Sequence, residues 1–220
     1  MKISAIITAG GSSSRFGGET NKLLEKIHSK EVIKYTIEAF LAVDEISEIV
    51  ICANVSIIPD LATIFKDFSQ IRIIEGGATR QQSVYNGILE LNNSDFVIIH
   101  DGARPMISPE IIKKAILDVQ TKKALTVAIK TTDTIKQVDE NLMIIKTIDR
   151  SSLYNTQTPQ AFEYNLIKSA HGKLKGQNFT DDAGMLEFLG KDVYVLEGDY
   201  KNIKVTTKSD IAVASVYLAP

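Results

Sequence analysis

The sequence has little that would tie the chain to a membrane, a nucleic acid or a structural metal. Its 220 residues carry a formal net charge of −2, so no general positive field attracts nucleic acid or anionic lipid. Its apolar runs stop well short of the roughly 18 residues that a membrane-spanning helix requires. The single cysteine, Cys52, excludes an intramolecular disulfide and a cysteine-based zinc site, and no two histidines have metal-site spacing. We therefore predict a soluble, cytoplasmic protein that binds neither nucleic acid nor membranes.

Short apolar segments alternate along the chain with segments of helical periodicity. We expect strands at residues 3–9, 48–53, 71–77, 95–101, 193–198 and 202–207, and helices at 31–43, 58–68, 79–91, 108–120, 163–176, 180–190 and 207–219. The helix at 180–190 is expected to begin at a Thr180 cap. This order predicts a mostly parallel, twisted sheet with helices on both faces. The predicted fold is therefore a Rossmann-like, three-layer α/β/α architecture in one domain over residues 1–220.

Residues 125–149 interrupt this alternation because they contain no helical period. After a first strand, residues 134–138 and 142–148 read as two strands around a turn, which predicts a β-hairpin arm at about residues 130–150. Apolar side chains, Ile135, Val138, Met143 and Ile145, lie along it. Because an isolated hairpin is only marginally stable, we expect a homodimer formed by arm exchange. The alternative is that the arm folds back on its own domain.

A loop rich in glycine and serine follows the first strand, in the stretch "TAGGSSSRFGGETNKLL" (Thr8–Leu24). Successive glycine and serine amides form concave sites for phosphate oxygens, and Arg15 and Lys22 supply positive charge. The stretch lacks both G-x-x-x-x-G-K-[ST] and G-x-G-x-x-G, which argues against a P-loop and against a dinucleotide oxidoreductase. The pattern favours an anion site over a flexible surface turn.

The loop resembles the signature of nucleotidyltransferases that join a nucleoside monophosphate to a phosphorylated sugar or polyol. Six later motifs follow in order: "GGATRQQSV" (Gly76–Val84), "HDGARP" (His100–Pro105), "TIDR" (Thr147–Arg150), "QTPQAF" (Gln157–Phe162), "TDDA" (Thr180–Ala183) and "NIKVTT" (Asn202–Thr207). Together they resemble the 2-C-methyl-D-erythritol 4-phosphate cytidylyltransferase family over essentially the whole chain. One departure is "NKLL" around Lys22, where relatives often have proline before the lysine and glutamine after it.

This resemblance implies transfer of CMP from CTP to 2-C-methyl-D-erythritol 4-phosphate, with release of pyrophosphate. Ribitol 5-phosphate as the acceptor is the alternative within the same chemistry, and a nucleotide-binding module without catalysis is the alternative outside it. A phosphomonoester has a second pKa near 6, so the attacking oxygen is already an anion and needs no general base. Positioning and charge stabilisation are what such a reaction demands of the protein.

The resemblance also implies roles for individual residues. Arg15 and Lys22 are the expected catalytic residues. The expected nucleotide site comprises Ala9, Gly10, Gly11, Ser12, Ser13, Ser14, Gly77, Ala78, Arg80, Ser83 and Asp101. The expected polyol-phosphate site comprises Arg104, Thr134, Arg150, Thr180 and Lys204, with the arm residues reaching across from a second subunit. Mg²⁺ is the expected cofactor, held by Asp101 or through the CTP phosphates. His100 is expected to be packed and hydrogen-bonded, whereas His28 and His171 lie in polar patterns and receive no role.

Overall fold

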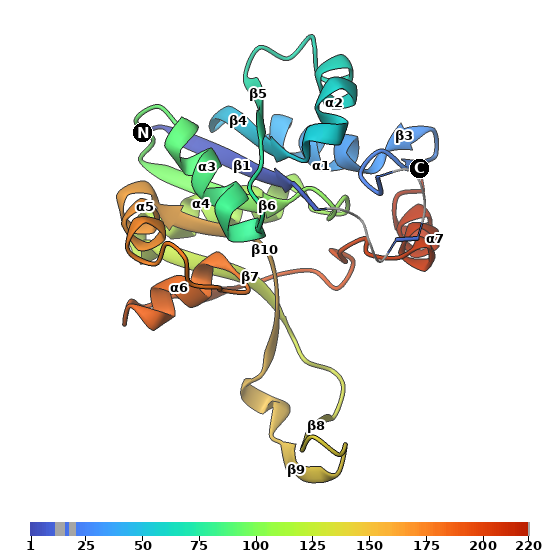
Figure 1. Ribbon diagram of the computed structural model, residues 1–220, viewed down its shortest axis with the longest axis vertical. Helices are drawn as coiled ribbons and strands as arrows, with labels where there is room; N and C mark the ends of the chain where they lie inside the picture. Colours follow the sequence, from blue (N-terminus) through green and yellow to red (C-terminus); the bar gives the residue numbers. More distant parts are fainter. Residues whose placement is uncertain (12–15, 18–20, 220) are drawn as a thin grey trace.

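A seven-stranded sheet forms the centre of the protein in the computed structural model, which describes residues 1–11, 16–17 and 21–219 (Figure 1). The strand order is β11-β7-β10-β6-β1-β4-β5. The strands are β1 (Ile3–Ala9), β4 (Ile46–Ala53), β5 (Ile71–Glu75), β6 (Phe96–Asp101), β7 (Ala124–Lys130), β10 (Tyr154–Glu163) and β11 (Tyr194–Glu197). Only β10 among these seven runs antiparallel to its neighbours, β6 and β7. The mostly parallel sheet predicted from the sequence is confirmed.

Helices cover both faces of this sheet, which is why its inner strands are apolar on both sides. On β1, Ile3 and Ile7 belong to one core cluster and Ile6 to the other, and all three are buried. The first cluster includes residues of α1 (Val32–Leu41), α2 (Ile58–Ile64), α4 (Pro109–Lys122) and α7 (Lys208–Tyr217). The second includes residues of α3 (Arg80–Glu90), α5 (Tyr164–Lys173) and α6 (Asp182–Phe188). No helix in the described part of the chain is long and apolar enough to span a membrane.

Local start signals account for several helix boundaries. Ser108 caps α4, with Pro109 as its first residue, and Thr207 and Asp210 form a capping box at α7, both as expected from the sequence. The predicted cap of α6 is wrong by one residue. Asp181 rather than Thr180 caps this helix, because its Oδ1 atom accepts the Gly184 amide hydrogen bond at 3.0 Å.

Two further expectations about strands are wrong. Residues 202–207 form no strand; the segment is irregular, and the Val205 amide donates to the Ala103 carbonyl at 2.8 Å instead of joining a ladder. Conversely, β10 contains the motif "QTPQAF", for which the sequence predicted no strand. Its polar side chains are buried: Gln157, Thr158 and Gln160 are at most 5% exposed.

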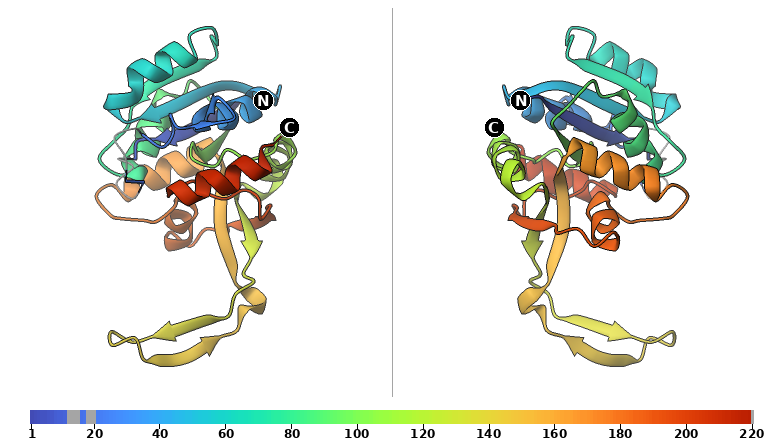
Figure 2. Two further views of the ribbon diagram at one scale, coloured as in Figure 1. Left: turned by 90° about the vertical axis from the view of Figure 1, so that its right-hand side faces the viewer. Right: turned by 90° about the vertical axis from the view of Figure 1, so that its left-hand side faces the viewer.

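The predicted hairpin arm is present and projects away from the sheet (Figure 2). Within the described residues, strands β8 (Ile135–Val138) and β9 (Ile144–Ile148) pair only with each other, and the 3₁₀ turn η2 (Arg150–Ser152) lies at the base of the arm. Apolar side chains near its tip are strongly exposed, from 55% for Ile145 to 80% for Leu142. The arm does not fold back on its own domain. The remaining short elements are β2 (Lys26–Ile27), β3 (Lys30–Glu31) and η1 (Val55–Ile57).

Candidate active site

A cavity of about 520 Å³ opens at the carboxyl ends of β1, β4 and β6. These strands are parallel and adjacent, so the residues at their ends, Ala9, Asn54 and Asp101, meet at one edge of the sheet. This is where open α/β sheets bind ligands. The lining residues are Thr8, Ala9, Gly10, Gly11, Lys22, Leu23, Asn54, Gly77, Ala78, Thr79, Arg80, Ser83, Asp101, Ala103, Lys204 and Thr206.

Asp101 is the buried carboxylate around which the cationic side chains of this cavity gather. Its Oδ2 atom lies 2.8 Å from Lys204 Nζ and 3.5 Å from Arg104 Nε, and its Oδ1 atom lies 3.3 Å from Arg80 Nε. The Thr8 hydroxyl donates to Oδ1 at 3.2 Å. Burial opposes ionisation, but Lys204 and Arg80 outweigh it and hold the pKa of Asp101 well below its usual range. Asp101 is therefore ionised and neutralises part of a positive cluster.

A buried hydrogen-bond chain beneath the sheet edge orients Asp101. The Asp101 amide donates to Thr158 Oγ1 at 3.1 Å, and the Thr158 hydroxyl lies 3.0 Å from His100 Nδ1. With the hydroxyl hydrogen directed to Nδ1, the other nitrogen, Nε2, carries the proton and faces the Arg104 carbonyl oxygen at 3.4 Å. Burial lowers the pKa of His100 to about 3, so the ring is neutral. The expected packed, hydrogen-bonded histidine is confirmed.

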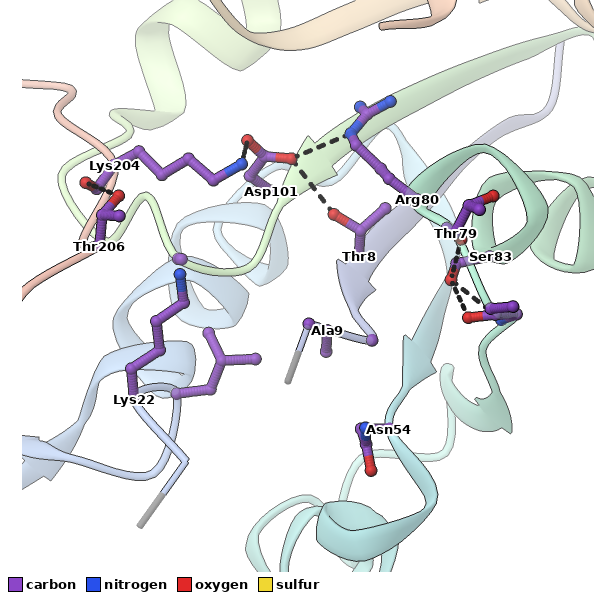
Figure 3. Close-up of a pocket in the computed structure, with 16 residues that line it drawn as sticks. Thr8, Ala9, Lys22, Asn54, Thr79, Arg80, Ser83, Asp101, Lys204 and Thr206 are labelled. Atoms are coloured by element: carbon purple, nitrogen blue, oxygen red, sulfur yellow. Dashed lines mark hydrogen bonds and ion pairs between the residues drawn. The ribbon is translucent and has the colours of Figure 1, made fainter. Parts of the chain in front are cut away.

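Arg80 joins this cavity to a second buried carboxylate. It is the first residue of α3, and its Nη1 atom donates to Asp182 Oδ2 at 2.7 Å. Burial opposes its charge, but Asp182 and then Asp101 outweigh burial and raise the pKa of the guanidinium. Figure 3 shows Arg80 on one side of Asp101, and Lys22 and Lys204 on the other. An anion in the cavity would thus meet positive charge on two sides.

The wall formed by residues 76–79 depends on close backbone packing. A Cβ atom at Gly77 would lie 2.1 Å from Gln82 Cγ and 2.9 Å from the Gln82 backbone carbon, so only glycine fits there without a shift. Ser83 supports the same turn: its hydroxyl donates to the Thr79 carbonyl at 2.9 Å and accepts from the Gly77 amide at 3.0 Å. The structure therefore offers a glycine wall whose shape Ser83 maintains.

Comparison with known proteins decides the family. Residues 3–220 match the family described as 2-C-methyl-D-erythritol 4-phosphate cytidylyltransferase (IspD). A protein of that name from Clostridium perfringens (strain SM101) is 40% identical over 227 residues, which cover 99% of each chain. The chain belongs to this cytidylyltransferase family. It is accordingly a nucleotidyltransferase of the kind that uses CTP.

Crystal structures of cytidylyltransferases of this family share the fold. The 4-diphosphocytidyl-2C-methyl-D-erythritol synthase of Anaerococcus prevotii superimposes with a TM-score of 0.89 at 34% identity, covering 100% of this chain and 99% of that one. The 2-C-methyl-D-erythritol 4-phosphate cytidylyltransferase of Francisella tularensis gives 0.84 at 28% identity, covering 99% and 100%. These matches do not favour ribitol 5-phosphate cytidylyltransferase, the alternative that the sequence left open.

Most of the cytidylyltransferase residues expected from the sequence come together in the cavity. It is lined by Ala9, Gly10, Gly11, Lys22, Gly77, Ala78, Arg80, Ser83, Asp101 and Lys204. Arg104 does not line the cavity itself; it pairs with Asp101, which does, and donates through Nη1 to the Asn202 carbonyl at 2.7 Å. Ser12, Ser13, Ser14 and Arg15 lie outside the described residues, so their expected roles stay predictions.

Besides Arg104, three residues expected at the polyol-phosphate site do not line the cavity of their own chain. Thr180 is exposed just before α6. Thr134 and Arg150 are exposed on the arm, where the Arg150 guanidinium contacts the Thr132 carbonyl. The last two were expected to act on a second subunit, and this expectation also stays a prediction.

Some residues of this cavity, and of the ion pairs that extend from it, were not expected from the sequence. Asn54 could have been found, because it follows β4 just as Asp101 ends β6. Asp182 lies within the motif "TDDA" but was given no role of its own, and nothing in the sequence indicated that it pairs with His171. His171 was placed in a polar surface pattern, which is wrong: it is 1% exposed, and its Nε2 atom lies 3.1 Å from Asp182 Oδ1. Its charged neighbours in the sequence had concealed its burial.

Proposed function

We propose that this chain transfers CMP from CTP to 2-C-methyl-D-erythritol 4-phosphate within the cavity at the carboxyl ends of β1, β4 and β6. The observation that carries this assignment is the cluster of Arg80, Arg104 and Lys204 around Asp101, in a protein of this family. Two highly charged anions must meet in such a reaction. Positive charge fixed in place before they bind lowers the electrostatic cost of that meeting.

In the proposed reaction, an oxygen of the acceptor phosphate attacks the α-phosphorus of CTP. The bond from that phosphorus to the bridging oxygen of the β-phosphate breaks, and its electron pair leaves with pyrophosphate. Lys22 lines the same cavity as Gly10 and Gly11, which supports a role in stabilising the charge that grows on the phosphates. We propose the same role for Arg15, and we propose that the amides of residues 9–14 bind the triphosphate.

The two walls of the cavity suit different ligands. The wall of Gly77, Ala78 and Thr79 has short side chains and offers backbone groups, which suits a flat nucleobase. The opposite wall carries Lys204 and Thr206, which suits the phosphate of the acceptor. The Lys204 side chain is 39% exposed, so it can reach an incoming phosphate. Arg104 supports this second wall from behind, through Asp101 and Asn202.

We propose Mg²⁺ as the cofactor, bound mainly by the phosphates of CTP. Among the described residues, no three His, Cys, Asp or Glu side chains are grouped closely enough to hold a metal. Asp101 offers one carboxylate, and both its oxygens already have cationic or hydroxyl partners. One carboxylate with substrate phosphates is nevertheless a common Mg²⁺ environment, and the ion would neutralise phosphate charge there. Chelation of divalent cations should therefore abolish turnover, and added Mg²⁺ should restore it.

We further propose a homodimer in which each arm contributes Thr134 and Arg150 to the site of the other subunit. The projecting arm supports this, because Leu142, Met143 and Ile145 are too exposed for a hairpin that stays in water. A cytoplasmic location suits both the use of CTP and a chain with one buried, free cysteine, Cys52.

Pyrophosphate release with CTP and Mg²⁺ tests the function directly. The assay compares 2-C-methyl-D-erythritol 4-phosphate with D-ribitol 5-phosphate at equal concentrations. Faster release with the first acceptor is the expected result. Faster release with D-ribitol 5-phosphate would instead assign the chain to the activation of that polyol phosphate. No pyrophosphate release with either acceptor would refute the proposed reaction.

A further inference from the structure

Asp182 is a buried carboxylate that the reaction proposed above does not use. It is the first residue of α6, is 1% exposed and does not line the cavity. Its backbone amide donates to Gln160 Oε1 at 3.0 Å, and Gln160 in turn donates to Thr126 Oγ1 on β7 at 2.9 Å. Gln160 therefore links the first residue of α6 to strand β7, and this link fixes the position of the Asp182 carboxylate.

Both oxygens of that carboxylate are occupied by side chains from other helices. Arg80 of α3 donates to Oδ2 at 2.7 Å, and His171 of α5 lies with Nε2 3.1 Å from Oδ1. The His171 ring stacks on Tyr85, which also belongs to α3, with 5.7 Å between ring centroids and 5° between ring planes. Arg80 and His171 outweigh the effect of burial and lower the pKa of Asp182, so it is ionised.

The guanidinium of Arg80 therefore has two anchors, one inside the cavity and one outside it. Its bond to Asp182 is short, at 2.7 Å, whereas its contact with Asp101 is longer, at 3.3 Å. Asp182 is also the more buried carboxylate, and charge-assisted hydrogen bonds of this kind are strong. The outer anchor, Asp182, thus determines where the guanidinium lies relative to the glycine wall of residues 76–79.

We propose that Asp182 and His171 are positioning residues for CTP binding, which act by holding Arg80 in place from behind the cavity. Neither side chain lines the cavity; His171 orients the Asp182 carboxylate, and Asp182 orients Arg80. The proposal rests on CTP as the ligand of this cavity. Without Asp182, the guanidinium keeps Asp101 as its carboxylate partner and shifts toward Lys204.

Two substitutions isolate this effect. Asp182→Asn keeps the shape of the side chain but removes its charge, and His171→Phe keeps a ring to stack on Tyr85 but removes the hydrogen-bond donor. We expect the KM for CTP to rise about tenfold in D182N, as for the loss of one charge-assisted hydrogen bond, and less in H171F. The KM for the acceptor should change less than twofold in both. Asp118→Asn is the matched control, because it removes a carboxylate paired with Lys122 on the surface of α4.

A double-mutant cycle separates positioning from a general structural role. If Asp182 acts through Arg80, D182N should raise the KM for CTP less than twofold in an Arg80→Gln background. The proposal would be overturned if D182N raised the KM for CTP by the same factor in the wild-type and R80Q backgrounds. It would also be overturned if D182N left the KM for CTP unchanged and only reduced the fraction of active protein. H171F with R80Q provides the same cycle if D182N does not fold.

Calorimetric titration of the wild type with CTP distinguishes failure of the proposed function from failure of the positioning role. Absence of CTP binding refutes the proposed function itself, whereas CTP binding together with additive effects in the double-mutant cycle refutes only the positioning role.

Discussion

Replacing His100 with asparagine should flatten the pH dependence of the free energy of unfolding between about pH 6.5 and 4.5. His100 is fully buried on β6, and burial lowers its pKa from 6.5 to about 3. The unfolded chain therefore binds a proton at this position below pH 6.5, whereas the folded chain does not. Because protons then bind preferentially to the unfolded state, stability falls as the pH falls.

The size of the effect follows from the shift in pKa. Each pH unit below 6.5 costs the folded state about 1.4 kcal/mol until the ring is protonated in the fold as well. Because the unfolded ring is only half protonated at pH 6.5, the full slope is reached below that pH, and His100 should account for a loss of about 2.3 kcal/mol between pH 6.5 and 4.5. Asp101 and Asp182 affect stability at a lower pH than His100, because their pKa values are lowered in the folded protein. The stability that they contribute is fully present above the pKa of an unfolded aspartate, near 3.9, and is lost only as the pH falls below that value.

Urea unfolding followed by far-ultraviolet circular dichroism at pH 7.5, 6.5, 5.5 and 4.5 provides the measurement. Asparagine can accept from Thr158 but does not titrate, and every other ionisable group is common to both proteins. We expect H100N to be less stable at pH 7.5, because it leaves a cavity, and its deficit to shrink by about 2.7 kcal/mol by pH 4.5. Parallel loss of stability in the two proteins would refute a buried, neutral His100.

Three further variants test the cavity and the arm. Gly77→Ala should lower kcat/KM for CTP at least tenfold, because the new Cβ atom would lie 2.1 Å from Gln82 Cγ and would shift the glycine wall of residues 76–79. Unchanged kinetics would contradict the tight fit at this position. Lys204→Met should raise the KM for the acceptor about 10- to 100-fold, as expected for the loss of a charged contact. Lys201→Met, on the same segment, is the control and should leave this KM unchanged. Equal effects of the two substitutions would contradict a role for Lys204 in binding the acceptor. Replacing both Met143 and Ile145 with glutamate should shift the protein toward monomer in sedimentation velocity and weaken turnover, and unchanged sedimentation and activity would argue against arm exchange.

The parts of the fold that sequence reasoning recovered are those determined by local pattern. The uniformly apolar β1 and the amphipathic α4 with its Ser108 cap carry their structural signal within a few residues. The site glycines and Asp101 were also found, because each stands at the carboxyl end of a predicted strand.

The parts that were missed are those determined by partners far along the chain. Strand β10 has a polar sequence, and it lies in the sheet because its buried glutamines and threonine bond residues such as Thr126, Asp199 and His100. Residues 202–207 look like a strand, yet Asn202 is held by the Thr158 carbonyl and Val205 by Ala103. The pair of Arg80 and Asp182 spans 102 residues, and no local period indicates it.

The cations around Asp101 differ in how readily they can change partner. Arg80 and Arg104 are largely buried and bonded to further groups, Asp182 and the Asn202 carbonyl, so moving either would leave buried polar atoms without partners. The Lys204 side chain is 39% exposed, and an ion pair at that exposure contributes little stability. Asp101 can therefore release Lys204 to an incoming phosphate at small cost and still be neutralised by the two arginines. Of the three cations around Asp101, Lys204 is thus the one that can most readily turn to the phosphate of the proposed acceptor.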